Sequence, residues 1–310
     1  MSEQEQPLKI NCRGCRSRYD VSDLEAFSLF DCPRCGLKLR VPKRFGMFLL
    51  EKLCGRGGMS HIYRAVDLRN MCKVAVKILN PDCDDPDLKK GYLKEFEMLK
   101  GLSGRPGIVP FYDAGDVDGV HYMSMQYLPG GDAEQRLRSG RLPERRIVAN
   151  WLADVGEGLD AAHSLHIVHH DIKPSNIFIN PEGRALLGDF DLADFREDGD
   201  CTTPCHGWAS PAYVSPERLY GGGEDFKGDI FSLGVSAYEL LGGKLPFSSH
   251  GKEAELYDER RLMAFTDLYE LAPELGMETS DLVRSMLEFN PAMRPDYPEA
   301  VAVFRMLEWE

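Results

Sequence analysis

The chain has 310 residues, of which 43% are hydrophobic and 28% charged, and its formal net charge is −13. This composition is typical of a folded protein with a substantial core and excludes a disordered or fibrous chain. No stretch approaches the ~20 uninterrupted apolar residues of a membrane span, and the polar start lacks the features of a secretory signal. We therefore expect a cytoplasmic protein that does not enter a membrane, and we expect no internal repeats.

Residues 8–42 contain two Cys-x-x-Cys pairs separated by sixteen residues. This spacing matches a four-thiolate zinc site, although disulfides and a redox-active Cys-x-x-Cys pair remain as alternatives. The segment resembles a zinc ribbon, in which a structural Zn²⁺ would supply much of the folding free energy of so small a fold. The expected zinc ligands are Cys12, Cys15, Cys32 and Cys35. The other five cysteines show no such spacing as a set: Cys54, Cys72, Cys83, Cys201 and Cys205.

Charge is distributed unevenly along the chain. Residues 1–44 carry a net charge of +3 and the remainder carries −16. An acidic remainder argues against nucleic acid as a partner and permits basic protein segments. The basic residues of the start lack interleaved exposed aromatics, which favours a solvated face over a phosphate-binding one. Apart from Lys9, they are Arg13, Arg16, Arg18, Arg34, Lys38, Arg40, Lys43 and Arg44.

Residues 53–63 place three glycines between two apolar stretches. This pattern predicts a strand, a glycine turn and a returning strand. Glycines allow backbone amides to approach phosphate oxygens without a side chain in the way, and the alternative for this motif alone is an ordinary hairpin turn.

Residues 74–79 form an apolar, β-branched run that is typical of a buried strand, and Lys77 lies within it. A helix is expected over residues 87–102, where Glu95 falls on the apolar face and Glu97 points off it. That face consists of Leu88, Tyr92, Leu99 and Leu102. Because a buried charge is costly unless it is paired, we predict an ion pair between Lys77 and Glu95.

Residues 169–176 read His-His-Asp-Ile-Lys-Pro-Ser-Asn and are the most informative stretch of the chain. In phosphoryl transfer to a hydroxyl, an Asp accepts the proton, a Lys two residues later neutralises the moving phosphoryl group, and an Asn five residues later holds a metal ion. The stretch resembles the catalytic loop of the eukaryotic-like serine/threonine protein kinases of bacteria.

Other motifs of that family follow in order. Residues 185–191 resemble its metal-binding Asp-Phe-Gly motif, and residues 210–217 resemble the end of its activation segment. The resemblance implies that Glu217 pairs with Arg294, that Asp229 supports the backbone of the catalytic loop, and that Ser210 hydrogen-bonds into this loop.

The resemblance implies an α+β fold with two lobes over residues 45–309, a β-rich N-terminal lobe and a helical C-terminal lobe. It implies ATP with Mg²⁺ or Mn²⁺ as cofactors and Ser or Thr hydroxyls of proteins as acceptors. The residues expected in catalysis are Asp171, Lys173, Asn176, Lys77 and Glu95, and those expected to hold Mg²⁺ are Asn176 and Asp189. The expected nucleotide contacts are Leu53, Gly55, Gly57, Gly58, Ile62, Ala75, Lys77, Met125, Gln126, Leu128, Asp132, Phe178 and Asp189.

Three positions depart from the family pattern. Ser60 stands where the spaced glycine motif that begins Gly55-x-Gly57 has its last glycine, His170 stands in place of Arg, and Asp191 stands in place of Gly. None of them removes a group that touches metal or proton, which favours an active kinase over the alternatives, a pseudokinase or a zinc-ribbon binding scaffold without turnover. In relatives, the Arg is paired by a phosphorylated residue of the activation segment. We expect His170 to be neutral near pH 7, so that activity depends weakly on Thr202 and Thr203, where autophosphorylation is expected.

Overall fold

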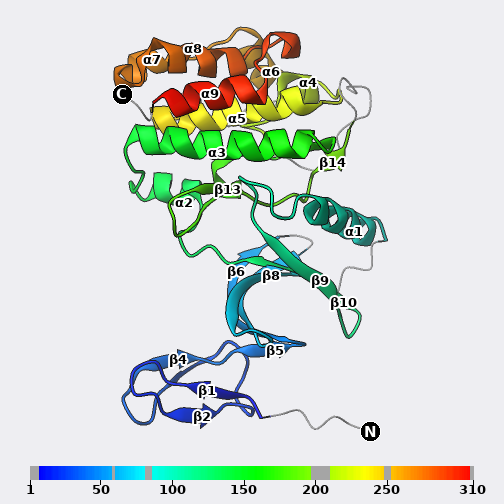
Figure 1. Cartoon of the computed structure of the whole chain (residues 1–310), viewed down its shortest axis with the longest axis vertical. Coiled ribbons are helices and arrows are strands. Elements are labelled where there is room, and N and C mark those ends of the chain that lie inside the picture. The colour runs from blue at the N-terminus through cyan, green and yellow to red at the C-terminus, as the bar shows by residue number, and fades with distance from the viewer. Residues whose placement is uncertain (1–6, 58–59, 81–85, 197–209, 248–252, 308–310) are drawn as a thin grey trace. The chain divides into compact units, whose positions relative to one another are not determined.

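The computed structural model describes residues 7–57, 60–80, 86–196, 210–247 and 253–307 (Figure 1). The chain forms two compact units, one of residues 1–88 with 111–127 and one of residues 89–110 with 128–310. The first is rich in strands and the second in helices, so the predicted division into a β-rich and a helical lobe is confirmed. Every helix within the described ranges is too short or too polar to cross a bilayer.

Two short antiparallel hairpins open the N-terminal unit. Strand β1 (Lys9–Asn11) pairs with β2 (Arg18–Asp20), and β3 (Leu29–Asp31) pairs with β4 (Lys38–Arg40). Their small core holds the buried Cys12, Cys32 and Leu39, with the rings of Tyr19 and Phe30 packed against it.

The two hairpins are copies of one pattern, which corrects the expectation that the chain has no repeats. Residues 9–21 and 29–41 each contain a strand, a Cys-x-x-Cys turn, a returning strand and a final buried Val. The residue after the second Cys has a positive φ in both copies, 60° at Arg16 and 72° at Gly36. Both turns therefore bend the chain in the same way around their sulfur atoms.

A six-stranded antiparallel sheet follows in the order β5-β6-β7-β8-β10-β9. Its strands are β5 (Lys43–Phe45), β6 (Phe48–Arg56), β7 (Ser60–Asp67), β8 (Cys72–Leu79), β9 (Phe111–Val117) and β10 (Val120–Gln126). Side chains alternate across a strand, so Val74, Val76 and Ile78 of β8 share one face. They are buried there with Phe48 and Leu50 of β6. Ala75 and Lys77 therefore share the opposite face of the sheet.

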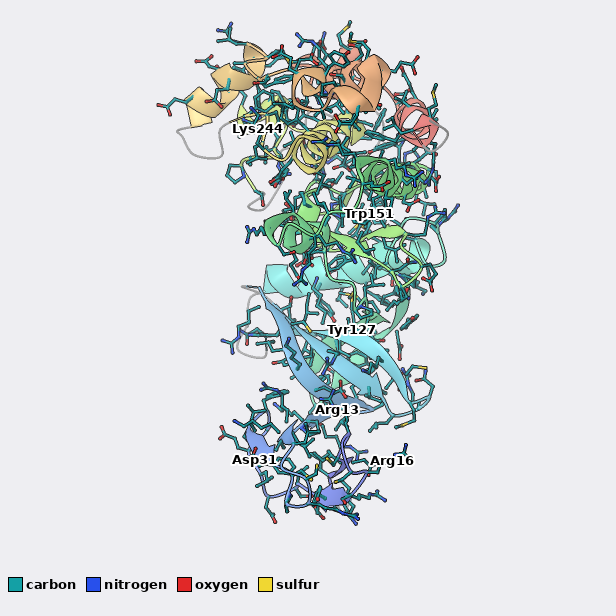
Figure 2. All side chains as sticks on the ribbon, turned by 90° about the vertical axis from the view of Figure 1, so that its left-hand side faces the viewer. Arg13, Arg16, Asp31, Tyr127, Trp151 and Lys244 are labelled. Carbon is teal, nitrogen blue, oxygen red and sulfur yellow. The ribbon has the colours of Figure 1, made fainter. Side chains whose placement is uncertain are left out.

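The hairpin segment packs against this core face of the sheet. The ring of Phe27 stacks on Tyr63 of β7 with centroids 5.7 Å apart and an interplanar angle of 15°. Tyr63 in turn stacks with His61 at 6.4 Å. The exposed side chains of Arg13, Arg16 and Asp31 lie on the hairpins themselves (Figure 2).

The C-terminal unit is built from helices. Its central helix α5 (Phe226–Gly242) begins at the N-cap Asp225 and ends at Gly243, whose φ is 78°. Most of α5 is buried, and α3 packs beside both α5 and α9 (Figure 1). The other helices of this part are α1 (Pro86–Gly101), which begins at the end of the N-terminal unit, α2 (Ala133–Arg138), α3 (Arg145–His163), α4 (Pro216–Leu219), α6 (Glu253–Arg261), α7 (Leu268–Leu271), α8 (Gly276–Met286) and α9 (Tyr297–Met306).

Two small antiparallel pairs of strands position the loops of interest. One joins β11 (Ile167–Val168) to β14 (Asp194–Phe195), and the other joins β12 (Ile177–Ile179) to β13 (Ala185–Leu187). The segment between β11 and β12 is the predicted catalytic loop, and it contains the 3₁₀ helix η1 (Pro174–Asn176). Two further 3₁₀ helices are η2 (Pro273–Leu275) and η3 (Pro291–Met293).

Candidate active site and metal centre

The three polar side chains predicted for the catalytic loop converge. Lys173 Nζ lies 2.7 Å from Asp171 Oδ2, and it also donates to Ser210 Oγ at 3.1 Å. Asn176 Nδ2 donates to the carbonyl oxygen of Asp171 at 2.8 Å and lies 3.2 Å from Asp171 Oδ2. The predicted contact of Ser210 with this loop is confirmed, and a carboxylate, an ammonium and a carboxamide share one small region.

Asp229 holds the backbone of this loop, as predicted. It lies in the first turn of α5 and is 1% exposed. Its carboxylate accepts the backbone N–H groups of His169 at 2.7 Å and His170 at 2.8 Å. Burial raises the pKa of Asp229, although the neighbouring histidines and these N–H donors act in the opposite direction.

The ring of His169 is held as one tautomer. Its Nε2 lies 3.2 Å from the carbonyl oxygen of Gly188, which can only accept, so Nε2 carries the proton. Its Nδ1 then accepts the backbone N–H of Asp171 at 3.2 Å. Burial lowers the pKa of His169, in keeping with a neutral ring. A neutral His169 therefore links the catalytic loop to the segment that carries Asp189.

Asp189 follows β13 and is tied to the catalytic loop through its neighbours. The N–H of Gly188 donates to the carbonyl oxygen of Asn176 at 3.0 Å, and the buried ring of Phe190 packs edge-on against His169 at 4.5 Å. Asp189 has a φ of 65°, a conformation that is uncommon outside glycine and is found at functional sites. Asp191, which stands where the family has Gly, does not have a positive φ. Its side chain therefore causes no backbone strain in this conformation.

Lys77 and Glu95 are both buried, at 3% and 4% exposure. Lys77 lies on β8 between Ile62 of β7 and Met123 of β10, and Glu95 lies on the inner face of α1. Glu97 is exposed, as expected. Since Lys77 and Glu95 belong to different units, the ion pair between them stays a prediction.

The residues predicted to contact the nucleotide fall on both units. Leu53 and Gly55 lie on β6, Ile62 on β7, Ala75 on β8, and Met125 with Gln126 on β10, where Met125 faces Ala75. In the C-terminal unit, the backbone of Asp132 forms an isolated antiparallel β-bridge with Phe178 of β12, and Leu128 is buried. The carboxylate of Asp132 caps α2 by accepting the N–H of Gln135 at 2.8 Å. Gly57 closes the turn by donating its N–H to the carbonyl oxygen of Ser60 at 2.8 Å, and Gly58 lies outside the described residues.

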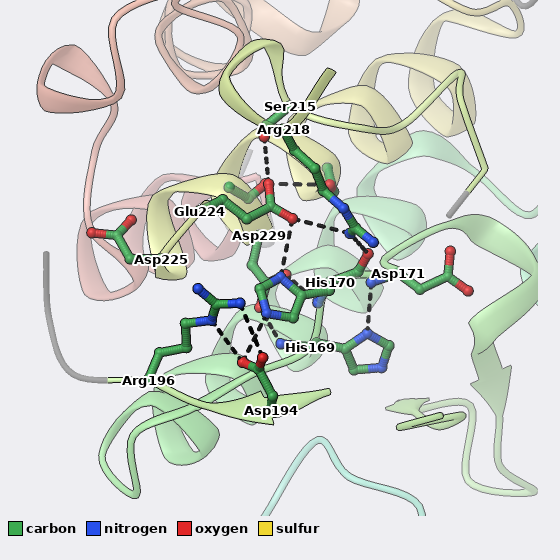
Figure 3. A network of polar contacts seen from close by, with 12 residues as sticks. His169, His170, Asp171, Asp194, Arg196, Ser215, Arg218, Glu224, Asp225 and Asp229 are labelled. Carbon is green, nitrogen blue, oxygen red and sulfur yellow. Dashed lines mark hydrogen bonds and ion pairs between the residues drawn. The ribbon is translucent and has the colours of Figure 1, made fainter. Parts of the chain in front are cut away.

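The expectation that His170 is neutral stays a prediction, and the surroundings of the ring favour the protonated form instead. The ring is buried, with Nδ1 3.0 Å from Glu224 Oε1 and Nε2 3.1 Å from Asp194 Oδ1 (Figure 3). A neutral imidazole has one N–H and would turn its lone pair toward one of the two carboxylates, whereas an imidazolium donates to both. This geometry favours a protonated, positively charged His170 ring. Thr202 and Thr203 lie outside the described residues, as do Cys83, Cys201 and Cys205.

The predicted ion pair of Glu217 with Arg294 is confirmed and is bidentate, with N–O distances of 2.7 and 2.9 Å. The guanidinium of Arg294 is fully buried and also donates to the carbonyl oxygens of Lys227, Glu288 and Phe289. This pair fixes the start of α4 to the loop around η3.

Replacing Glu217 with Ala should lower the free energy of unfolding by about 3–5 kcal/mol, because it leaves a buried guanidinium without its counter-charge. Urea unfolding of the purified protein measures this change. The control is Glu182→Ala, which removes an exposed carboxylate and is expected to change stability by no more than about 0.5 kcal/mol. Equal stability of the two variants would contradict a structural role for the pair.

The four cysteines of the hairpins form a cluster. Their sulfur atoms all lie within 4.8 Å of one another, with Cys12 Sγ to Cys35 Sγ at 3.5 Å and Cys15 Sγ to Cys32 Sγ at 3.6 Å. These distances exceed the ~2.05 Å of a disulfide and fit the ~3.8 Å edge of a tetrahedron around zinc with Zn–S bonds of ~2.3 Å. The cluster therefore has the donor set and spacing of a structural zinc site.

Tyr19 is a further member of this cluster that sequence reasoning missed. Its hydroxyl lies 3.1 Å from Cys32 Sγ. Burial raises the pKa of the Cys32 thiol, but hydrogen bonds from Tyr19 and from the backbone N–H groups of Arg34 and Cys35 outweigh burial and lower the pKa to about 6. The polypeptide thus favours a thiolate at Cys32.

Comparison with known proteins decides the family. The model of the protein kinase domain matches residues 48–303. The chain belongs to the protein kinase family. The kinase domain is homologous to those of bacterial serine/threonine kinases, so the predicted fold and family are confirmed.

Three bacterial relatives illustrate the similarity. The kinase domain resembles the serine/threonine-protein kinase PknA of Mycobacterium tuberculosis, which is 31% identical over 288 residues, covering 88% of this chain and 63% of PknA. PknJ and PknE of Mycobacterium bovis are 32% and 34% identical over 210 and 206 residues, which cover 66% of this chain and 35% and 36% of those proteins. The chain thus spans less than two thirds of the length of the curated relatives it matches.

Proposed function

We propose that this protein kinase is catalytically active and transfers the γ-phosphoryl group of ATP to Ser and Thr hydroxyls of proteins. The observation that carries the proposal is the convergence of Asp171, Lys173 and Asn176 in one loop. Lys173 is typical of the serine/threonine branch of the family and not of the tyrosine branch. The proposed domain boundaries are 8–42 for the zinc ribbon and 45–309 for the kinase domain.

Each residue of the loop has a distinct role in this proposal. Lys173 and Asn176 both contact Oδ2 of Asp171, so we assign acceptance of the hydroxyl proton to Oδ1. Lys173 neutralises charge on the phosphoryl group as it moves. Lys77, on the N-terminal unit, binds the α- and β-phosphates, and Glu95 orients it. Positioning and electrostatic stabilisation, rather than covalent chemistry, provide the acceleration.

Asn176 and Asp189 offer the oxygen ligands that Mg²⁺ prefers. Because Nδ2 of Asn176 donates to Asp171, its Oδ1 is the atom left for a metal. Asp189 adds a carboxylate at the surface of the same unit. Asn176 and Asp189 would hold Mg²⁺, which would supply positive charge against the phosphates, and Mn²⁺ satisfies the same ligands.

The local geometry favours activity over a pseudokinase. Ser60 and Asp191 replace glycines of the family pattern, and neither has a positive φ, so neither substitution strains the backbone. His170 replaces an arginine, and its two carboxylate partners favour a positive charge on its ring. All five predicted catalytic residues are present. The departures therefore remove none of the groups that the reaction requires.

A peptide mixture that offers Ser, Thr and Tyr hydroxyls tests the proposal. Incubation with MgATP labelled at the γ-phosphate should place label on Ser and Thr, with ADP formed in equal amount. Label on Tyr alone would contradict the serine/threonine assignment. The protein substrates in the cell, a cytoplasmic location and autophosphorylation at Thr202 or Thr203 are further parts of this proposal that rest on the sequence.

We propose a structural Zn²⁺ for the cysteine cluster. The purified protein should contain about one zinc per chain, and replacing Cys12 and Cys15 together with Ser should release it, because two of four ligands are lost. Metal analysis measures the zinc content. Cys54→Ser with Cys72→Ser is the matched control, since both of these thiols are exposed and lie outside the cluster. Freshly prepared reduced protein without zinc would overturn the assignment.

A nucleic-acid-binding role for the ribbon is less well supported. The eight basic side chains named above are exposed, as is Lys9, but the three aromatic rings of the ribbon pack within the protein. Tyr19 and Phe30 pack against the cysteine cluster, and Phe27 stacks on Tyr63. Stacking on bases needs accessible rings. A gel mobility shift with single-stranded nucleic acid should accordingly show no complex at physiological salt.

A further inference from the structure

His170, the residue before the proposed catalytic base, is held at every polar atom. Its backbone N–H donates to Asp229, its ring nitrogens face Glu224 and Asp194, and its carbonyl oxygen accepts from Arg218 Nη1 at 2.7 Å (Figure 3). Its φ of 66° is uncommon for a residue other than glycine. Such a backbone conformation persists only where surrounding contacts stabilise it. Here the contacts at the backbone N–H, the two ring nitrogens and the carbonyl oxygen do so.

Glu224 is the centre of these contacts and is 2% exposed. Its Oε1 contacts His170 Nδ1 and also accepts from Arg218 Nη1 at 3.1 Å, while its Oε2 accepts a hydrogen bond from Ser215 Oγ. The pKa of Glu224 is lowered, because His170, Arg218 and Ser215 together outweigh the burial that would raise it. Glu224 is therefore an ionised carboxylate beside the catalytic loop.

Gly228 makes room for this carboxylate. A Cβ atom at position 228 would lie 2.2 Å from Glu224 Oε2 and 2.6 Å from its carboxyl carbon. Any residue with a side chain at position 228 would thus displace Glu224 from His170. The residues around Glu224 come from neighbouring elements of the fold: Ser215 precedes α4, Arg218 lies on α4, and Gly228 lies in the first part of α5.

Asp194 completes the surroundings of the ring on the other side. It lies on β14 and pairs with Arg196, whose Nε and Nη2 lie 2.9 and 3.0 Å from its carboxylate. Hydrogen bonds from His170 and Arg196 lower the pKa of Asp194 despite its partial burial. In the described part of the chain, both ring nitrogens of His170 thus face carboxylates of the protein itself.

We propose that Glu224 is a positioning residue of the catalytic loop, whose buried carboxylate pairs with the His170 imidazolium and holds Asp171 in its active position without phosphorylation of the activation segment. The proposal rests on the proposed kinase function. The anion that orders the loop is supplied permanently by a residue 54 positions away in the sequence. The enzyme is therefore active as synthesised, and Thr202 and Thr203 tune this activity only weakly.

Glu224→Gln tests this role, because it keeps the shape of the side chain and removes its charge. We expect kcat to fall by about 10- to 100-fold, the loss typical of a hydrogen bond to a charged group, with KM for ATP unchanged. The rate of wild type should vary little between about pH 6 and 7.5, whereas the rate of the variant should fall as the pH rises through this range and His170 loses its proton. The charged groups that face His170 in the described structure are Glu224, Asp194, Asp229, Arg218 and Arg196, and only the first is changed.

Glu182→Gln is the matched control, since it makes the same chemical change at an exposed position and should match wild type. Thr202→Ala with Thr203→Ala should keep most of the wild-type rate. A Glu224→Gln enzyme that matches wild type in kcat and pH profile would overturn the proposal. So would a double alanine variant that is inactive at every pH, or a Glu224→Gln variant whose kcat falls with no change in pH profile. Absence of turnover in wild type would instead overturn the proposed function.

A measurement on wild type avoids any dependence on the folding of a variant. The ¹⁵N signals of the His170 ring, assigned by their loss in His170→Gln, should show both nitrogens protonated at pH 7.5. A singly protonated ring at that pH would overturn the proposal irrespective of the kinetic results.

Discussion

Replacing Asp171 with Asn is expected to lower the rate of phosphoryl transfer by about 10²- to 10⁴-fold, the usual contribution of a general base. Asn keeps the size of the side chain and still accepts a hydrogen bond from Lys173, which lies 2.7 Å from the carboxylate in wild type. It cannot take up the proton of the acceptor hydroxyl. The affinity for MgATP should therefore change little, and the loss should appear in kcat. Initial rates at saturating ATP and peptide measure the effect.

The control for this experiment is Asp281→Asn, which makes the same substitution at an exposed position of α8 and should leave the rate unchanged. An Asp171→Asn enzyme with near-normal turnover would show that another group accepts the proton. The roles given to Lys173 and Asn176 would then also have to be withdrawn, since both are defined by their contacts with Asp171.

Lys77→Met should abolish phosphoryl transfer, with a loss of about 100-fold or more, as expected when a preorganised charge is removed from a reacting phosphate. The methionine side chain fills the volume of the lysine stem between Ile62 and Met123, so the sheet should keep its fold. Glu95, the predicted partner, can turn outward to water. Circular dichroism and urea unfolding check the fold, and labelled ATP measures the transfer.

Lys73→Met provides the comparison on the same strand, because Lys73 is exposed. It should retain full activity. Near-normal turnover in Lys77→Met would refute the assignment of Lys77 to the phosphates, whereas a loss of activity with a loss of fold would show that its role is structural.

Contacts within a short stretch of chain could be predicted from the sequence. Asp171, Lys173 and Asn176 lie within six residues, and a tight loop leaves such side chains few ways to avoid one another. The inward position of Glu95 followed from helical periodicity and the outward position of Glu97 from the same argument. The long-range ion pair of Glu217 with Arg294 could be predicted only from the family resemblance.

The surroundings of His170 could not be predicted in this way. Glu224 and Asp194 lie 54 and 24 residues from His170, and no periodicity connects them. Without these partners, the reference behaviour of histidine suggests a neutral ring near pH 7, whereas two facing carboxylates favour a charged one. Tertiary packing brings these carboxylates to the ring, and Gly228 opens the space that Glu224 occupies.

The central claim is that this protein catalyses phosphoryl transfer. A side-by-side assay of wild type and Asp171→Asn tests it most directly. Binding of MgATP is measured first on both proteins, and transfer of the labelled γ-phosphoryl group to Ser and Thr is then followed on the same samples. We predict that both proteins bind nucleotide and that only wild type transfers phosphate at a substantial rate. Wild type that binds MgATP but leaves every Ser and Thr unlabelled would contradict the claim and identify a pseudokinase.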